Sequence, residues 1–94
     1  MVRFEWTPEG YQRVLALGLD PVEVDRALRG PGPRLRQMVA DDVLSVVVRT
    51  ADRTLIEVWL QEDPVDGQWE IFAAFEAGLL GQAKWSNAFG QEET

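Results

Sequence analysis

The chain contains no cysteine and no histidine. It therefore has no thiolate or imidazole for a zinc site, a thiol nucleophile or histidine-based acid–base catalysis. Lysine is almost as rare, because Lys84 is the single one in 94 residues. No apolar run approaches the roughly 18 residues that a membrane span requires. These absences exclude several enzyme classes and predict a protein with no metal, no cofactor and no membrane segment.

The residues that are present describe an ordinary globular chain. Hydrophobic residues make up 46% of the sequence and charged residues 27%, which is typical of a globular domain. A length of 94 residues is enough for one hydrophobic core and too short for two. We therefore expect residues 1–94 to form a single domain. The opening residues, MVRFEWTPEG, lack the apolar stretch of a signal peptide, so we expect a cytoplasmic protein.

The net charge of −7 is unevenly distributed along the chain. Residues 1–40 carry six arginines and five acids, whereas residues 41–94 carry three basic and eleven acidic residues. Because affinity for nucleic acid comes largely from lysine and arginine on phosphates, this composition argues against a nucleic-acid partner and favours a basic protein surface. The arginines between residues 26 and 36 leave two alternatives open: a phosphate-facing patch, or a solvated helix face and strand edge.

Capping residues and apolar spacing predict two short helices near the N-terminus. Thr7 is suited to cap the first helix and Pro8 to open it, and a glycine follows its last turn. Asp20 and Pro21 have the same two roles in the second helix, which the GPGP segment at 30–33 ends. The apolar stripes expected to be buried comprise Tyr11, Val14, Leu15, Val24, Ala27 and Leu28.

From residue 34 onward the apolar residues follow a period of two, which is typical of strands. The four predicted strands span 33–39, 42–50, 54–62 and 68–76. Short polar turns at 40–42, 50–53 and 62–67 join them into an antiparallel meander. We therefore predict an α+β fold, with two N-terminal helices packed on a four-stranded antiparallel sheet and a C-terminal helix within residues 77–94.

Alternation along the strands assigns their side chains to two faces of the sheet. One face is apolar and is expected to meet the helices as the core: Leu44, Val46, Val48, Ile56, Val58, Leu60, Trp69, Ile71, Ala73 and Phe75. The other face is mixed: Ser45, Val47, Arg49, Leu55, Glu57, Trp59, Gln61, Glu70, Phe72, Ala74 and Glu76. Either the C-terminal segment covers this mixed face, or the face stays open for a partner or ligand.

Four charged residues of the mixed face are expected to lie near one another: Arg49, Glu57, Glu70 and Glu76. Two carboxylates about a strand apart could share a proton and act as acid and base, while an arginine holds an anionic transition state. Arginine–glutamate pairs across neighbouring strands are also common stabilisers of antiparallel sheets. Both interpretations stay open from the sequence alone.

Three segments resemble the BrnT-type toxins of the RelE-like superfamily: FEWTPEG at the start, LALGLDPVEVDRAL across the two helices and WEIFAAFEAG at the end of the sheet. The compact motif consists of Phe4, Glu5, Trp6 and Pro8, and the likeness extends to about Gly78. The resemblance implies two helices joined at a glycine and followed by an antiparallel sheet. It also implies cleavage of mRNA by basic residues on the sheet and after its last strand, with inhibition by an antitoxin encoded alongside.

The chain departs from that family where the family's chemistry would lie. Leu17 occupies the position at which the family usually has histidine, and the segment 75–77 replaces the usual basic run after the last strand. Cleavage of RNA needs cations to bind the phosphodiester and to stabilise its developing charge, and carboxylates would repel it. We therefore expect a scaffold of this class that has lost its catalytic groups.

The leading hypothesis is a non-catalytic protein-interaction module that binds a protein partner, antitoxin-like or basic, through the mixed face. Its expected binding residues are Ser45, Arg49, Trp59, Phe72 and Glu76. A second hypothesis is a metal-independent ribonuclease toxin of a type II toxin–antitoxin system, with Arg49, Arg53, Glu57 and Glu70 as its catalytic residues. A third is an acidic antitoxin- or immunity-like inhibitor that mimics nucleic acid. A homodimer is a further alternative.

Overall fold

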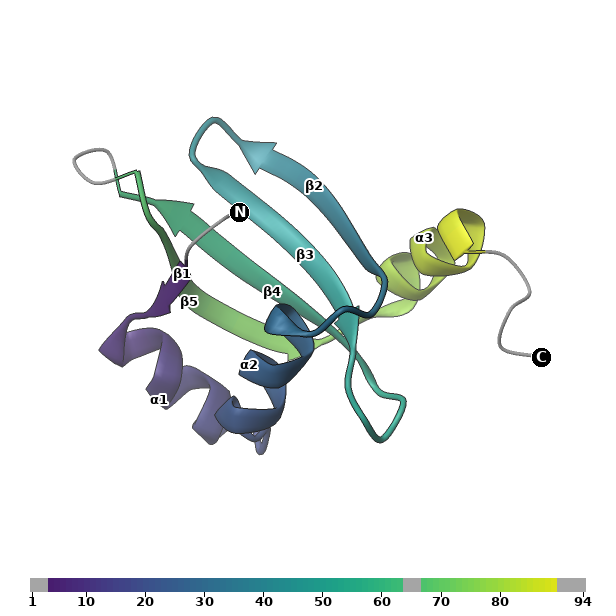
Figure 1. Cartoon of the computed structure of the whole chain (residues 1–94), viewed down its shortest axis with the longest axis horizontal. Coiled ribbons are helices and arrows are strands. Elements are labelled where there is room, and N and C mark those ends of the chain that lie inside the picture. Colours follow the sequence, from purple (N-terminus) through teal and green to yellow (C-terminus); the bar gives the residue numbers. More distant parts are fainter. Residues whose placement is uncertain (1–3, 64–66, 90–94) are drawn as a thin grey trace.

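The structure, a computed structural model, describes residues 4–63 and 67–89. Within these residues it contains three helices and a five-stranded mixed sheet with the strand order β1-β5-β4-β3-β2 (Figure 1). The elements in chain order are β1 (Phe4–Trp6), α1 (Pro8–Ala16), α2 (Pro21–Arg29), β2 (Arg34–Ala40), β3 (Val43–Arg49), β4 (Leu55–Glu62), β5 (Trp69–Glu76) and α3 (Leu79–Phe89). The predicted α+β class is confirmed.

The four strands that the sequence predicts are present as β2 to β5. Each pairs with the next in antiparallel fashion, so the meander is confirmed. A helix within the C-terminal segment is also confirmed, as α3. The centre of the predicted turn at 62–67 and the last five residues of the predicted C-terminal segment lie outside the described residues.

β1 makes the predicted four-stranded antiparallel sheet wrong in detail. It precedes both N-terminal helices and pairs with β5 in parallel, with Phe4 opposite Trp69 and Trp6 opposite Ile71. The pairing continues to the start of α1, where the backbone N–H of Thr7 donates to the carbonyl oxygen of Ile71 at 3.1 Å. The sheet is therefore five-stranded and mixed. A three-residue strand shows too little of the period-two pattern to be recognised beside a helix entry.

The caps of α1 and α2 are those that the sequence predicts. The side chain of Thr7 accepts a hydrogen bond from the N–H of Gly10 at 2.8 Å, and that of Asp20 accepts one from the N–H of Val22 at 3.0 Å. After α1 the chain turns at Gly18, whose φ of +80° lies in the region that favours glycine. Local side-chain chemistry thus sets where both helices begin.

α1 packs unusually close to β5. A Cβ atom built on Gly10 would lie 2.3 Å from the carbonyl oxygen of Ile71 and 2.9 Å from the Cα of Phe72. The guanidinium of Arg13, one turn later, donates to the carbonyl oxygen of Phe72 at 3.3 Å. The absence of a side chain at Gly10 therefore allows the helix backbone to lie directly on the strand.

β5 bulges at Phe72, next to this contact. On β4, Trp59 pairs with Ala73 and the following residue, Leu60, pairs with Ile71, so the pairing passes over Phe72. Because side chains alternate along a strand, one extra residue moves every later side chain to the opposite face. The second half of β5 is therefore inverted relative to the alternation of its first half.

The inversion corrects four of the faces assigned from the sequence. The pairs are Ala73 with Trp59, Phe75 with Glu57, Ala74 with Val58 and Glu76 with Ile56. The prediction that Ala73 and Phe75 face the core is wrong, because both share a face with the polar side of β4. The prediction that Ala74 and Glu76 lie on the mixed face is also wrong. Ala74 is fully buried, with 0% of its surface exposed.

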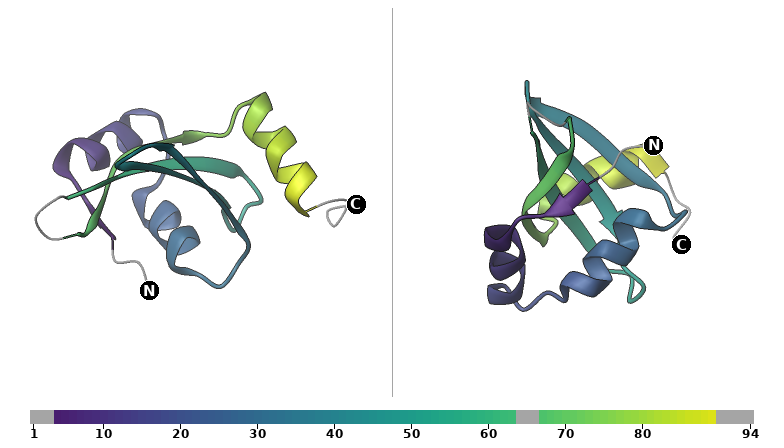
Figure 2. Two further views of the ribbon diagram at one scale, coloured as in Figure 1. Left: turned by 90° about the horizontal axis from the view of Figure 1, so that it is seen from above. Right: turned by 60° about the vertical axis from the view of Figure 1, so that its left-hand side comes forward.

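The core lies between the sheet and the helices α1 and α2. Its buried side chains are Val14, Val24, Leu28, Val46, Val48, Ile56, Val58, Leu60, Ile71 and Ala74. The predicted core residues of β3 and β4 are thereby confirmed, with Leu44 partly buried beside them. On α1 the buried stripe is narrower than predicted, because Tyr11 and Leu15 are exposed. α3 lies on the other side of the sheet from α2 (Figure 2).

Candidate functional site

The face of the sheet turned away from α1 and α2 is called here the outer face. Register places on it the side chains of Ser45, Val47, Arg49, Leu55, Glu57, Trp59, Gln61, Ala73 and Phe75. The ring of the bulged residue Phe72 also lies here, because it packs against Trp59. The bulge therefore adds Ala73 and Phe75 to the outer face in place of the predicted Ala74 and Glu76.

Three half-buried aromatic side chains, Trp59, Phe72 and Phe75, form a cluster on the outer face. The ring centroid of Trp59 lies 6.4 Å from that of Phe72, in edge-to-face geometry, and 6.2 Å from that of Phe75. Both distances fall in the range of favourable aromatic pairs. Each ring keeps part of its surface exposed. The outer face thus presents an apolar patch that is already assembled in the isolated chain.

The carboxylate of Glu57 holds the indole ring of Trp59 in place. One of its oxygens accepts hydrogen bonds from the hydroxyl of Ser45 at 2.9 Å and from the indole N–H of Trp59 at 2.6 Å. Ser45 is buried, and Glu57 is partly covered. Bonds to a charged acceptor are stronger than neutral ones. Glu57 therefore fixes the orientation of the indole ring and brings a negative charge beside the aromatic cluster.

α3 covers one end of the outer face. Its Trp85 is buried and lies under the guanidinium of Arg49, whose carbon is 5.2 Å from the ring centroid. Lys84 donates from its Nζ to the side-chain oxygen of Gln37 at 2.9 Å, which ties the helix to β2. Gly81 is buried in the same helix, where a Cβ would lie 3.3 Å from that of Ala77 and 3.8 Å from a carboxylate oxygen of Glu57. These contacts dock α3 near the ends of β2 and β3.

The same helix leaves part of the aromatic cluster exposed. Leu79 and Leu80, in its first turn, are 85% and 70% exposed. Phe89 packs on Trp85 within the helix, at 4.4 Å between ring centroids, and not on the strands' aromatic side chains. Within residues 77–89, the C-terminal segment therefore covers the outer face only at one end. A space of about 280 Å³ remains between α3 and the sheet, beside Glu57 and Phe75.

The structure brings together some of the residues predicted for a site and separates others. Ser45, Glu57, Trp59 and Phe72 lie side by side on the outer face. Glu70 is in register with Gln61, four residues along β4 from Glu57. At about 3.3 Å per residue, that spacing separates the two backbone positions by roughly 13 Å along the strand, which does not place the carboxylates as a pair that shares a proton.

The predicted cations lie outside the cluster. Arg49 stacks on Trp85 at the end that α3 covers. Arg53 lies in the turn between β3 and β4, in a backbone conformation with a φ of +69°. Glu76, at the end of β5, follows the register of the core face. The acid–base pair with a flanking arginine that the sequence allows is therefore not assembled in this arrangement.

Phe75 is the member of the aromatic cluster that sequence reasoning misses. Its assignment depends on the bulge, which leaves no compact signature in the sequence. A signal is nevertheless present, because the run 71–75 consists of five apolar residues in a row and interrupts the alternation of β5. Such an interruption is what an extra residue in a strand produces.

The turn before β4 contains a carboxyl group whose titration is perturbed. Asp52 accepts hydrogen bonds from the hydroxyl of Thr50 and from the backbone N–H of Thr54. The bond from Thr50, followed by those from Thr54, holds the pKa of Asp52 below its ordinary value. Because hydrogen bonds to a carboxylate favour its charged form, this group stabilises the turn and lies apart from the aromatic cluster.

Across the part of the chain that the structure describes, no three histidine, cysteine or acidic side chains are grouped closely enough to hold a metal ion. None of the three helices described is both long and apolar enough to pass through a membrane. The chain has no significant match among protein-family models, curated proteins or solved structures.

Proposed function

We propose that this domain is a non-catalytic protein-interaction module that binds a partner protein through its outer face. The observation that carries the proposal is the cluster of Trp59, Phe72 and Phe75, which is assembled on the sheet and left open by α3. Tryptophan is enriched at the energetic centres of interfaces, and preassembled aromatic groups lose little conformational entropy on binding. Leu79 and Leu80 extend the apolar surface at the start of α3.

The charge of the surroundings supports a basic partner. Glu57 lies beside Trp59, and Glu70 lies farther along the same face. Two cations border this face: Lys84 donates to Gln37 of β2, and Arg49 stacks on Trp85 at the end that α3 covers. A partner that places an apolar side chain on the cluster and a lysine or arginine beside Glu57 would complement both features.

The same features argue against the ribonuclease hypothesis. Binding an RNA phosphate requires free cations near the reacting atoms. The outer face instead has carboxylates at Glu57 and Glu70, which lie too far apart for shared acid–base work. We propose that the chain has kept a scaffold of the RelE/BrnT-like class as a binding surface only. The element order from β1 through two helices to an antiparallel meander supports that proposal.

The test begins with affinity capture from the producing organism, which identifies a binding partner by mass spectrometry. The purified partner is then titrated by calorimetry with the wild-type domain, with Trp59→Ala and with Val22→Ala. Val22 is a matched control, because it is an exposed apolar side chain on α2, away from the outer face. Loss of Trp59 should weaken binding by about 2 kcal/mol or more, while the control binds as tightly as the wild type.

Thermal melts show whether each variant is folded, and Phe72→Ala provides a second probe should Trp59→Ala unfold. Equal affinities for the outer-face and control variants would refute the proposal. Elution of the wild type as a dimer, lost in Trp59→Ala, would identify a second copy of the chain as the partner. Growth arrest on induced expression, abolished by combining Arg49→Ala with Glu57→Ala, would favour the ribonuclease instead. If the captured partner is a basic enzyme and the domain inhibits it, the domain is an immunity-like inhibitor.

A further inference from the structure

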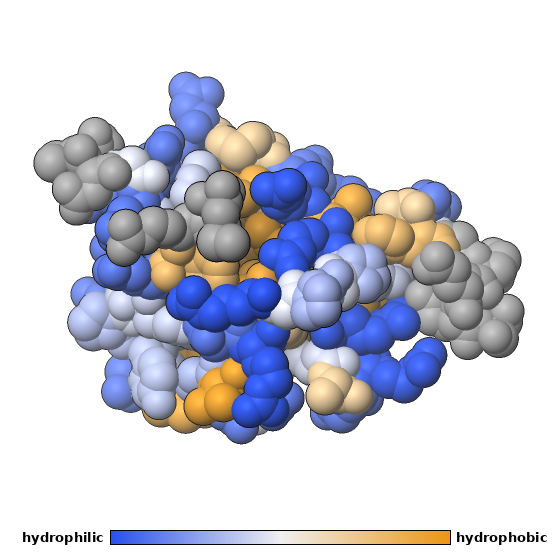
Figure 3. Space-filling model, viewed as in Figure 1, coloured by the Kyte–Doolittle hydropathy of each residue, from blue (hydrophilic) through white to orange (hydrophobic). Residues whose placement is uncertain are grey.

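The opposite side of the sheet contains a second candidate site. The helices α1 and α2 leave a corner of that side uncovered, and a groove of about 590 Å³ lies there between α2 and β2. Its floor is formed by the half-buried side chain of Leu44 and by the edges of the core side chains Val46 and Leu60. In the view of Figure 3, apolar surface is visible between hydrophilic side chains on this side of the molecule. The volume is within the usual range of pockets for small ligands.

Three arginines line this groove: Arg29 from α2, and Arg34 and Arg36 from β2. Arg34 and Arg36 pair with Val48 and Val46 of β3, so both extend on the core side of the sheet, toward the helices. They form a local concentration of positive charge in a chain whose net charge is −7. The sequence left two roles open for the arginines between residues 26 and 36. Arg29, Arg34 and Arg36 line the groove, whereas Arg26 pairs with Glu23 on the exposed side of α2.

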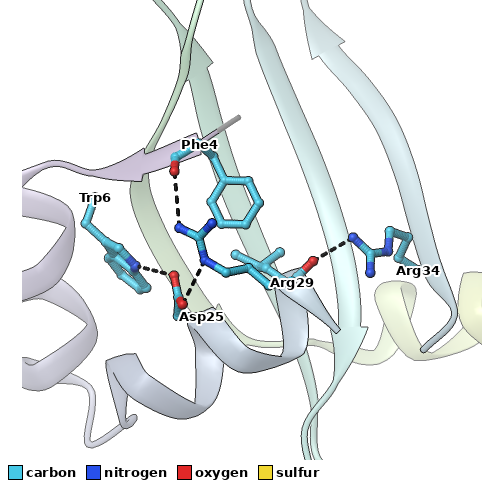
Figure 4. Close-up of polar contacts among 6 residues, drawn as sticks. Phe4, Trp6, Asp25, Arg29 and Arg34 are labelled. Carbon is cyan, nitrogen blue, oxygen red and sulfur yellow. Dashed lines mark hydrogen bonds and ion pairs between the residues drawn. The ribbon is translucent and has the colours of Figure 1, made fainter. Parts of the chain in front are cut away.

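Two of the three guanidinium groups are held in place by the protein itself (Figure 4). Arg29 donates to the carboxylate of Asp25 at 2.9 Å and to the carbonyl oxygen of Phe4 at 3.3 Å, and its guanidinium carbon lies 4.4 Å from the centroid of the Phe4 ring. Asp25 is itself fixed by the indole N–H of Trp6 at 3.2 Å.

Arg34 is anchored at the end of α2. It donates to the carbonyl oxygen of Leu28 at 2.6 Å and to that of Gly30, which are backbone acceptors without formal charge. A guanidinium has five N–H donors, so Arg29 and Arg34 each have three left after these bonds. Asp25 neutralises the charge of Arg29. The positive charges of Arg34 and Arg36 remain available to a ligand, because the acceptors of Arg34 are uncharged and Asp25 is bonded to Arg29. The groove thus offers oriented donors and uncompensated charge above an apolar floor.

We infer that this groove binds a small anionic amphiphile, with its carboxylate or phosphate head group on the arginines and its hydrocarbon chain on the floor of the groove. Carboxylate and phosphate oxygens are acceptors that match the fork of a guanidinium. The apolar floor distinguishes such a ligand from a simple inorganic anion. The site lies on the side of the sheet opposite the outer face, so it is independent of the protein-binding function proposed above.

The test is a calorimetric titration of the full chain with decanoate and with decyl phosphate, each below its micellar concentration. Decanol, decyltrimethylammonium and inorganic phosphate are the comparison ligands. We expect saturable binding of one anionic amphiphile per chain, weakened by added salt because the arginines are partly exposed. The stronger of the two anionic ligands identifies the head group. Binding of decanol or decyltrimethylammonium with equal affinity would overturn the inference, as would no saturable binding of either anion or equally tight binding of inorganic phosphate.

Arg36→Gln is the informative variant, since the side chain of Arg36 makes no hydrogen bond or ion pair with other described residues whose loss would disturb the fold. It should weaken binding about tenfold, as expected for one charge-assisted hydrogen bond. Arg26→Gln makes the same change in net charge outside the groove and should bind as the wild type does. Equal effects of the two substitutions would show that the ligand responds only to overall charge, and would refute the site.

Amide chemical shifts of the wild-type chain provide a measurement that requires no variant. Decanoate should shift the resonances of β2 and of the C-terminal turn of α2. Shifts centred on Trp59 instead would place the amphiphile on the outer face and would overturn this assignment without contradicting the proposed protein-binding function.

Discussion

Gly10→Ala should be strongly destabilising although alanine is the better helix former. Replacing glycine by alanine gains about 1 kcal/mol in a helix interior and at most that in the first turn, where Gly10 lies. Here the added Cβ would lie 2.3 Å from the carbonyl oxygen of Ile71 and 2.9 Å from the Cα of Phe72. Both are backbone atoms, so α1 as a whole must move away from β5. Overpacking of this kind costs about 1–3 kcal/mol, and at its upper end the net loss of unfolding free energy is about 2 kcal/mol.

Urea and thermal unfolding of the wild type, Gly10→Ala and Gly78→Ala measure this effect. For a domain of this size, about 2 kcal/mol corresponds to a fall in Tm of about 8–16 °C. Gly78 is the control, because a Cβ there would meet nothing within 4 Å and its backbone conformation suits alanine. Its variant should melt at or slightly above the wild-type temperature. A Gly10→Ala variant as stable as the wild type would show that α1 does not approach β5 so closely.

Three further predictions concern the core, the turn before β4 and the outer face. Val58→Ala should lower the free energy of unfolding by about 1–3 kcal/mol, since Val58 is fully buried; in urea titrations a loss no larger than that of the exposed control Gln12→Ala would contradict the strand register. The hydrogen bonds from Thr50 and Thr54 lower the pKa of Asp52 in the folded state, so their contribution is present at neutral pH and lost as the pH falls through that folded-state pKa. The Tm difference between wild type and Asp52→Asn should therefore narrow between about pH 7 and about pH 3; a constant difference would show that titration of Asp52 is not its origin. Glu57→Gln keeps an acceptor for Trp59 but removes the charge, so it should weaken the binding of a basic partner in low salt and much less in high salt. Calorimetry that shows the same loss of affinity at both salt concentrations would contradict an electrostatic role.

The helices and the four-stranded meander could be predicted because their signals are local. Thr7 and Asp20 are caps that act on N–H groups two or three residues away, and the strands of the meander follow one another through short turns. β1 could not be predicted, because its pairing with Ile71 and its neighbours depends on a segment distant in the sequence. Helix propensity and strand alternation contain no information about such a contact.

The candidate site could be predicted only up to the bulge. Residues on β3 and on β4, such as Ser45, Glu57 and Trp59, were placed correctly because both strands alternate without interruption. On β5 the predicted faces after Phe72 are inverted, because the bulge lies where the strand meets α1, a contact between segments far apart in the sequence. The arginine groove depends in the same way on distant contacts, because Arg29 is held partly by the backbone of Phe4.

The parallel pairing of β1 with β5 has a consequence for how the chain folds during synthesis. The bond between Thr7 and Ile71 joins residues 64 positions apart. The backbone groups of β1 and Thr7 can therefore be paired only after β5 has been synthesised. Contacts of such long sequence separation form late, because the entropy of closing the intervening chain must be overcome first. Until β5 is made, the backbone surface beside Gly10 that receives it remains exposed to water. We therefore expect nascent chains that stop before Trp69 to remain sensitive to proteases, and release of β5 to be the step that closes the fold.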